Sequence, residues 1–178
     1  GQDAFVMKLN PNAISAAEVV QYASYYGGGG VDSLKAMAVD PTGLIYLTGT
    51  TNSTDLITPN GYKSALGGGS SSGTVGTDAF VVFLDPARSG SLTLVYATYL
   101  GGTQYDEATA IAYFDGKIYV TGSTSSDDFP TVKAHQPGAL PGCKAPRIPA
   151  APLDEDLGAI LVVAGGQGAG DVLRSEQA

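Results

Sequence analysis

Apolar and polar residues alternate in short runs along most of the chain, which is the period-two pattern of half-buried β-strands. In the run 4–9, Phe5 and Met7 fall on one face of the expected strand, and the residues between them fall on the other. The runs are rich in Val, Ile, Tyr and Thr, which suit a pleated surface. The pattern predicts strands at residues 4–9, 19–26, 34–39, 44–49, 79–84, 92–100, 108–113 and 117–122.

The later strands repeat the earlier ones in sequence. Asp-Ala-Phe-Val at 3–6 returns about 75 residues later at 78–81. A repeat of this length means that one supersecondary unit is copied, and such units bury their apolar faces against their neighbours. Two further pairs of segments follow in the same order, 22–28 with 96–102 and 45–51 with 118–124.

The motifs of the second repeat resemble the SBBP family of bacterial β-propeller repeats. The first repeat keeps most of these motifs, and the resemblance covers residues 3–136. The motifs are Asp-Ala-Phe-Val at 78–81, Tyr-Ala-Thr-Tyr-Leu-Gly-Gly at 96–102, Ala-Ile-Ala at 110–112, Tyr-Val-Thr-Gly-Ser-Thr at 119–124 and Asp-Phe-Pro-Thr at 128–131.

This resemblance implies an all-β fold made of propeller-type blades, each a sheet of four antiparallel strands. The two repeats, 3–77 and 78–136, then form an incomplete ring, because a propeller needs roughly four to eight blades. The strand at 34–39 is expected to be an inner strand of its blade, and the strands at 79–84 and 92–100 are expected to be its outer pair. The chain would open on an outer pair of strands and stop after an inner pair at 108–124. We expect several copies to associate head to tail, or the chain to be part of a longer propeller.

Residues 137–178 lie outside the resemblance and are expected to form a tail rich in Pro and Gly. Five prolines in its first sixteen residues exclude a regular helix there. The apolar run 159–164 predicts one further strand. The Gly- and Ser-rich segment 67–73 has no apolar residue to pack, and it predicts a solvated loop inside the domain 1–136.

Charge and composition exclude several classes of partner. The net charge is −8 and the nine Lys and Arg are scattered singly, so no basic stripe is available for nucleic acid. No apolar run approaches the roughly 18 residues of a membrane-spanning helix. The acidic composition, rich in Ser and Thr, favours a secreted or cell-surface protein. The sequence as given does not begin with the pattern of a signal peptide, and its start at a repeat boundary leads us to expect a processed or excised piece of a longer protein.

Asp32 and Asp106 occupy equivalent positions, just before the inner strand of each repeat. The resemblance implies that this position lies near the mouth of a propeller channel, where ligands often bind. Asp32, Tyr105 and Asp106 are therefore the candidate binding residues. The alternative for the two carboxylates is structural, since an Asp in a turn accepts backbone N–H bonds. No catalytic residue is assigned.

Other residues give weaker indications of chemistry. Asp127 and Asp128 could contribute oxygen ligands to Ca²⁺, although the spaced acidic pattern of a dedicated loop is absent. No other cofactor or metal site is predicted. His135 is the only histidine and has no partner at a motif spacing, so we interpret it as a surface residue. Cys143, the only cysteine, excludes an internal disulfide, and a nucleophilic pair with His135 would lack a rigid scaffold.

These observations favour a non-enzymatic, extracytoplasmic β-propeller module that acts as a scaffold or as a binding surface for a protein or glycan. The alternative is a hydrolase or lyase that acts on a polysaccharide at the channel mouth, with Asp32, Asp106 and His135 as its acid and base residues. A third hypothesis is assembly alone, in which chains pair edge to edge into rings or fibres.

Overall fold

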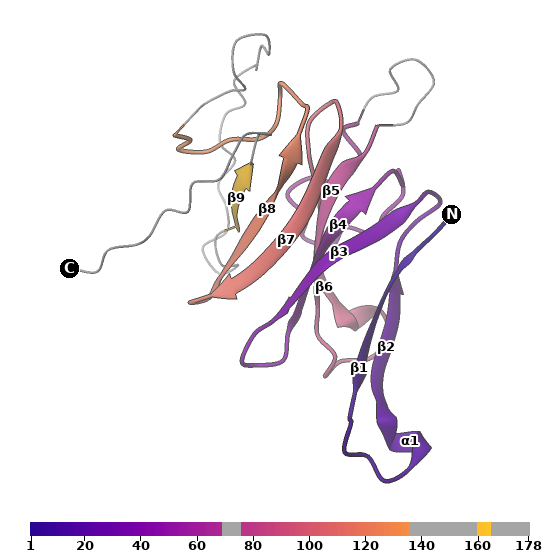
Figure 1. Cartoon of the computed structure of the whole chain (residues 1–178). Helices are drawn as coiled ribbons and strands as arrows, with labels where there is room; N and C mark the ends of the chain where they lie inside the picture. Colours follow the sequence, from indigo (N-terminus) through magenta and orange to yellow (C-terminus); the bar gives the residue numbers. More distant parts are fainter. Residues whose placement is uncertain (69–75, 136–159, 165–178) are drawn as a thin grey trace, which may run out of the picture.

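The computed structural model describes residues 1–68, 76–135 and 160–164. This part of the chain is mostly antiparallel β-strand, as predicted, with one short α-helix and one 3₁₀ helix (Figure 1). The elements are β1 (Ala4–Leu9), α1 (Ala16–Val19), β2 (Val20–Tyr26), β3 (Asp32–Val39), β4 (Ile45–Thr51), β5 (Asp78–Leu84), the 3₁₀ helix η1 (Gly90–Thr93), β6 (Leu94–Leu100), β7 (Asp106–Phe114), β8 (Lys117–Thr124) and β9 (Ile160–Ala164).

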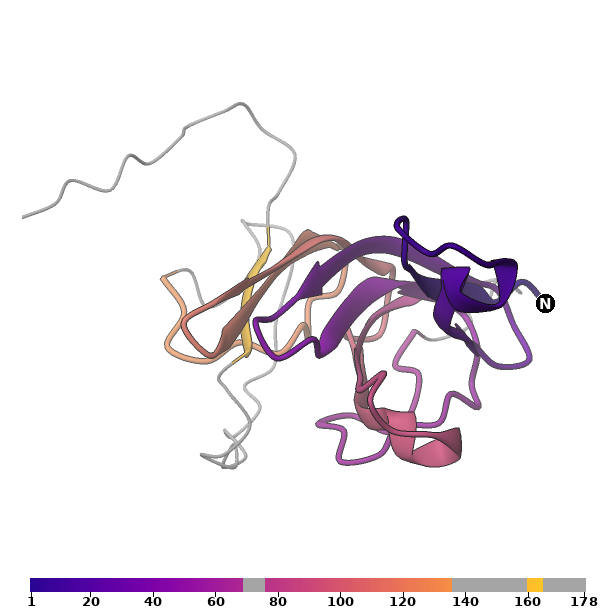
Figure 2. The same cartoon turned by 90° about the horizontal axis from the view of Figure 1, so that it is seen from below.

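The strands form three sheets that lie side by side in chain order (Figures 1 and 2). The central sheet has four antiparallel strands in the order β3-β4-β5-β6, which is the complete blade that the repeat predicted. The outer pair β1-β2 precedes it, and the sheet β7-β8-β9 follows it. The sheets do not close into a ring, so the incomplete propeller is confirmed.

One of the predicted strands begins two residues later than expected. The predicted strand 92–100 starts at Leu94, because the 3₁₀ helix η1 occupies the residues before it. The positive φ of Gly90, 61°, begins that turn. The tight turn between β7 and β8 has positive φ at both Asp115 and Gly116, which an Asp-Gly pair accommodates.

Two apolar cores lie between the three sheets. The first joins Val6 and Tyr26 of the outer pair to the central sheet, and the second joins the central sheet to β7 and β8. Successive side chains of a strand point to opposite faces of its sheet. Phe80 of β5 therefore enters the first core, whereas Val81 enters the second. Every residue of β5 is buried for this reason.

Among the described residues, each sheet that flanks the central blade packs against another sheet on one side only. In β1 the two buried residues are Ala4 and Val6, on the face toward the central blade. The strand β9 lies within the apolar run 159–164 and pairs with β8 in the parallel direction. The loop residues 69–75, Cys143 and the rest of the tail lie outside the described residues.

Candidate functional site

Two loops of equivalent sequence link the outer strand of one sheet to the inner strand of the next. Residues 27–31 join β2 to β3, and residues 101–105 join β6 to β7. Each loop passes over a second loop, which follows β4 or β8 in the same repeat. Polar side chains of that second loop and of the inner strand hold the first loop by its backbone N–H groups.

We call each of these arrangements, in which side chains bind the N–H groups of a loop, a cradle. The first cradle centres on Asp32. Its Oδ2 accepts hydrogen bonds from the N–H of Gly28 at 2.9 Å and from the hydroxyl of Ser53 at 2.7 Å. Its Oδ1 accepts the hydroxyl of Thr51. The other N–H groups of the loop are bound by side chains of residues 52–55: Gly29 by Asp55 at 2.7 Å, Gly30 by Ser53 at 2.9 Å and Val31 by Asn52 at 2.6 Å.

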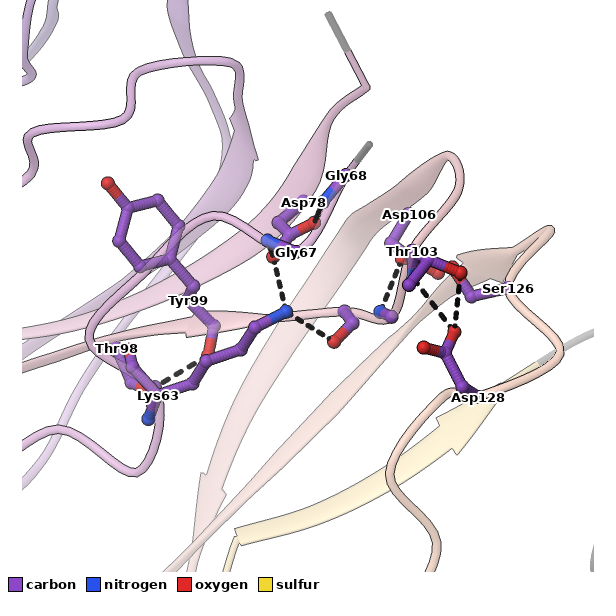
Figure 3. Close-up of polar contacts among 12 residues, drawn as sticks. Lys63, Gly67, Gly68, Asp78, Thr98, Tyr99, Thr103, Asp106, Ser126 and Asp128 are labelled. Atoms are coloured by element: carbon purple, nitrogen blue, oxygen red, sulfur yellow. Dashed lines mark hydrogen bonds and ion pairs between the residues drawn. The ribbon is translucent and has the colours of Figure 1, made fainter. Parts of the chain in front are cut away.

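The second cradle repeats this arrangement around Asp106 (Figure 3). Asp106 Oδ2 accepts the N–H of Gly102 at 2.8 Å and the hydroxyl of Ser126 at 2.7 Å. Asp128 accepts both the N–H of Thr103, at 2.8 Å, and its hydroxyl, at 3.0 Å. The same hydrogen bonds in two places show that the cradle belongs to the repeated unit.

The glycine pair of each loop is required by this close approach. A Cβ on Gly28 would lie 2.9 Å from the Cβ of Ser53, and one on Gly102 would lie 2.5 Å from the Cβ of Ser126. Real Cβ atoms do not come so close without displacing their neighbours. Glycine therefore lets the backbone reach the carboxylates that hold it.

A buried ion pair supports the second cradle. The carboxylate of Asp78 is fully buried, and its Oδ2 accepts a hydrogen bond from Lys63 Nζ at 2.8 Å (Figure 3). It also accepts the N–H groups of Gly67, at 2.9 Å, and Gly68, at 3.0 Å. Lys63 donates in addition to the carbonyl oxygen of Gly101 at 2.7 Å. The loop 63–68 is thereby fixed to the end of β6.

A family model of the SBBP β-propeller repeat matches residues 21–57 and 95–130. Each match begins at an outer strand, runs through an inner pair of strands and ends just after Asp55 or Asp128, so that it contains one whole cradle. The chain carries two SBBP β-propeller repeats. Comparisons of this SBBP chain with curated proteins and with solved structures gave no match. Its described helices include none with the length and apolar character needed to cross a membrane.

Asp32 and Asp106, the predicted binding carboxylates, lie inside the cradles of the two SBBP repeats. Their exposed fractions are 1% and 0%, and each holds its own loop. The geometry is that of the structural alternative, in which an Asp accepts backbone N–H bonds. Tyr105 differs from them, because its side chain is 47% exposed at the end of the second cradle.

The electrostatics of the second SBBP cradle differ from those of an exposed acidic loop. Burial raises the pKa of Asp106 above its ordinary value, and the nearby charge of Asp78 acts in the same direction. Hydrogen bonds from the side chains of Thr124 and Ser126 and from the N–H of Gly102 oppose this effect. The cradle is therefore a place where protonation and stability are coupled.

The remaining sequence candidates are placed as follows. Asp128, considered as a Ca²⁺ ligand, uses its carboxylate to hold Thr103. Within residues 1–68, 76–135 and 160–164, no group of three or more His, Cys, Asp or Glu side chains is placed to hold a metal ion. His135 is exposed, as interpreted, and Cys143 lies outside the described residues.

Sequence reasoning missed most members of the SBBP cradle. Ser53 and Asp55, with their equivalents Ser126 and Asp128, were not recognised as a set. The signal was present, because Thr-x-Ser-x-Asp occurs at 51–55 and again at 124–128. Polar residues that recur in a repeat at one spacing indicate a shared hydrogen-bonding role.

Proposed function

We propose that the two SBBP repeats form a rigid, non-enzymatic module that binds a glycan outside the cytoplasm. The observation that carries this proposal is the half-exposed ring of Tyr105 on a loop whose backbone the second cradle holds. A rigid loop loses little conformational entropy on binding, so the contacts it makes are retained as affinity. An aromatic ring on such a loop suits the apolar face of a sugar.

Polar groups next to Tyr105 support this choice of ligand. The Tyr105 hydroxyl donates to Glu107 Oε2 at 2.9 Å, and the hydroxyl of Ser123 donates to Glu107 Oε1 at 3.1 Å. Glu107 and Ser123 are partly exposed. An apolar ring beside a few oriented polar groups is typical of small-ligand recognition, and sugar hydroxyls can bond both the carboxylate and the Ser123 hydroxyl.

The burial of Asp32 and Asp106 argues against the hydrolase or lyase alternative. A general acid or base must come within hydrogen-bonding distance of the group that it serves, and a polysaccharide cannot reach either carboxyl in this arrangement. The net charge of −8 supports the location outside the cytoplasm. Fractionation of the cells that make the protein tests this location, and recovery only in the cytoplasm would contradict it.

The binding proposal is tested by screening the full chain on a glycan array and then titrating the best glycan by calorimetry. Tyr105→Ala should weaken binding about ten-fold or more, because a central aromatic contact is lost. The matched control is Tyr62→Ala, since Tyr62 is exposed to 45% on a different loop. Equal losses for the two variants, or cleavage of the glycan by the wild-type chain, would overturn the proposal.

A further inference from the structure

The third sheet has the inner half of a blade and a substitute for its third strand. In the complete blade, β4 pairs with β5 in the antiparallel direction, with Gly49 opposite Phe80. In the third sheet the equivalent edge of β8 pairs with β9 in the parallel direction, with Gly122 opposite Ala164. The strand equivalent to β5 is β1 of the first repeat, and among the described residues β1 pairs only with β2.

The outer pair β1-β2 exposes the residues that the complete blade buries. Phe5 is 66% exposed, whereas its equivalent Phe80 is 0% exposed. Tyr25 is 80% exposed, whereas its equivalent Tyr99 is 0% exposed. Met7 lies on the same face as Phe5 and is also exposed. One face of this outer pair therefore carries the apolar residues of a core, but no described sheet packs against it.

The third sheet has a hollow beside Gly122 that corresponds to the space around Phe80 in the complete blade. The hollow is shallow, is open to solvent and lies against β8. In the complete blade the equivalent space holds the ring of Phe80, which lies opposite Gly49 with its centroid 5.7 Å from that of Tyr26. The residues around the hollow are equivalent, one by one, to those around Phe80: Leu100 to Tyr26, Val120 to Leu47, Gly122 to Gly49 and Phe129 to Leu56.

We propose that the β1-β2 pair of a second copy of this chain completes the third sheet by pairing with β8 in place of β9. Phe5 of the second copy would enter the hollow. The register follows from the complete blade, because a shift by one residue would turn every side chain to the wrong face. It places Ile118 opposite Leu9, Val120 opposite Met7, Gly122 opposite Phe5 and Thr124 opposite Asp3 of the second copy.

Hydrogen bonding in the complete blade supports the same partner. The hydroxyl of Thr48 is buried and donates to the carbonyl oxygen of Phe80 at 2.7 Å. Its equivalent in the third sheet, Thr121, is exposed. In the proposed pairing Thr121 donates to the carbonyl oxygen of Phe5 of the second copy, as Thr48 does in the complete blade.

The contact is head to tail, so it leads to a ring or to an open fibre. Each copy supplies strands for two blades: the central blade and the two halves that flank it. Because propellers close with roughly four to eight blades, a ring would contain about two to four copies. The edge of every β8 would then be paired in the same way.

Self-association is measured by sedimentation equilibrium of the full chain over a range of concentrations. We expect masses that are multiples of 18.0 kDa and that rise with concentration. Phe5→Lys should weaken the association by about a hundred-fold or more, because burial of one Phe side chain corresponds to roughly two tenfold steps in the binding constant. A chain that stays monomeric at every concentration would overturn the proposal.

The matched control for Phe5→Lys is Leu92→Lys. Leu92 is also 66% exposed but lies in η1, away from the proposed contact. Both substitutions are at exposed positions, so both variants should fold, and far-UV circular dichroism checks this. Association that responds equally to the two variants would mean that another surface is used, and it would overturn the proposal.

The register is tested by disulfide trapping in a Cys143→Ser background. One chain carries Met7→Cys, a second carries Val120→Cys, and the two are mixed and oxidised. The proposed pairing sets these positions opposite each other, so a crosslink between the two chains is expected. Lys8→Cys replaces Met7→Cys in the control, because residue 8 is one position out of register and on the other face. Equal crosslinking of both pairs would overturn the register.

The exchange with β9 is tested by the double variant Val162→Pro, Val163→Pro. Proline removes backbone donors from β9, and two successive positions affect both of its edges. Loss of β9 frees β8, so the second copy should bind more tightly. Unchanged or weaker association would contradict competition between β9 and the second copy for this edge.

Discussion

Replacing Tyr99 by phenylalanine tests how the first cradle is supported. The ring of Tyr99 is 0% exposed in the first core, and its hydroxyl makes two hydrogen bonds. It donates to the carbonyl oxygen of Ser53 at 2.8 Å and accepts the N–H of Leu56 at 2.9 Å. Ser53 and Asp55, whose side chains hold the loop 27–31, lie in the segment that these two bonds fix, so this one hydroxyl supports the base of the cradle.

Tyr99→Phe keeps the ring and its packing but leaves two backbone groups without a partner. Ser53 is 1% exposed and Leu56 is 6% exposed, so water reaches neither group readily. A buried group left unpaired costs about 1–3 kcal/mol. Partial relaxation of the loop reduces the sum for two groups, and we expect the free energy of unfolding to fall by about 2–4 kcal/mol.

The measurement is urea unfolding followed by far-UV circular dichroism, at a protein concentration low enough for the chain to be monomeric. The control is Tyr25→Phe, because Tyr25 is the equivalent residue of the first repeat and is 80% exposed. It should change the free energy of unfolding by less than about 0.5 kcal/mol. If Tyr99→Phe were no more damaging than this control, the hydroxyl would not support the cradle as argued.

Two further predictions concern charged groups. Lys63→Met removes the cation paired with the buried Asp78. It should lower the free energy of unfolding by about 2 kcal/mol, since Lys63 itself is partly exposed. The control is Arg88→Met, which breaks the exposed ion pair with Asp85 and should lower the free energy of unfolding by less than about 0.5 kcal/mol in the same urea assay. Because burial raises the pKa of Asp106 in the folded chain, the folded state binds that proton more tightly than the unfolded state does. Lowering the pH through the raised pKa toward the ordinary value of about 3.9 should therefore stabilise the wild type relative to Asp106→Asn. The measurement is the urea midpoint of both proteins at neutral and at acidic pH. A difference between the two midpoints that stays constant with pH would contradict this prediction.

Local signals were enough to predict the strands, whereas their order in the blade was implied by the resemblance to the SBBP family. Alternation in the run 4–9 placed Phe5 and Met7 on one face, and the structure has β1 at Ala4–Leu9 with this orientation. The tight turn at Asp115 and Gly116 is likewise local, because an Asp-Gly pair accommodates the positive φ that both residues have. These features depend on neighbours within a few residues, so the sequence specifies them directly.

The cradles were harder to predict because they join loops that are far apart in the chain. Asp32 was recognised as a repeated position, yet its burial depends on Ser53, which lies 21 residues later. Asp78 likewise depends on Lys63, which lies 15 residues earlier, in the loop before β5. Hydrogen bonds of this kind form only where the pairing of distant strands brings their loops together.

The sequence by itself determined that two equal units exist, which faces their strands have and where the turns fall. Only the tertiary structure decided which of these faces is covered. Phe5 and Phe80 stand in the same Asp-Ala-Phe-Val motif, but one is 66% exposed and the other is 0% exposed. The physical reason is that periodicity defines a face within one strand, whereas burial requires a second sheet to lie against it.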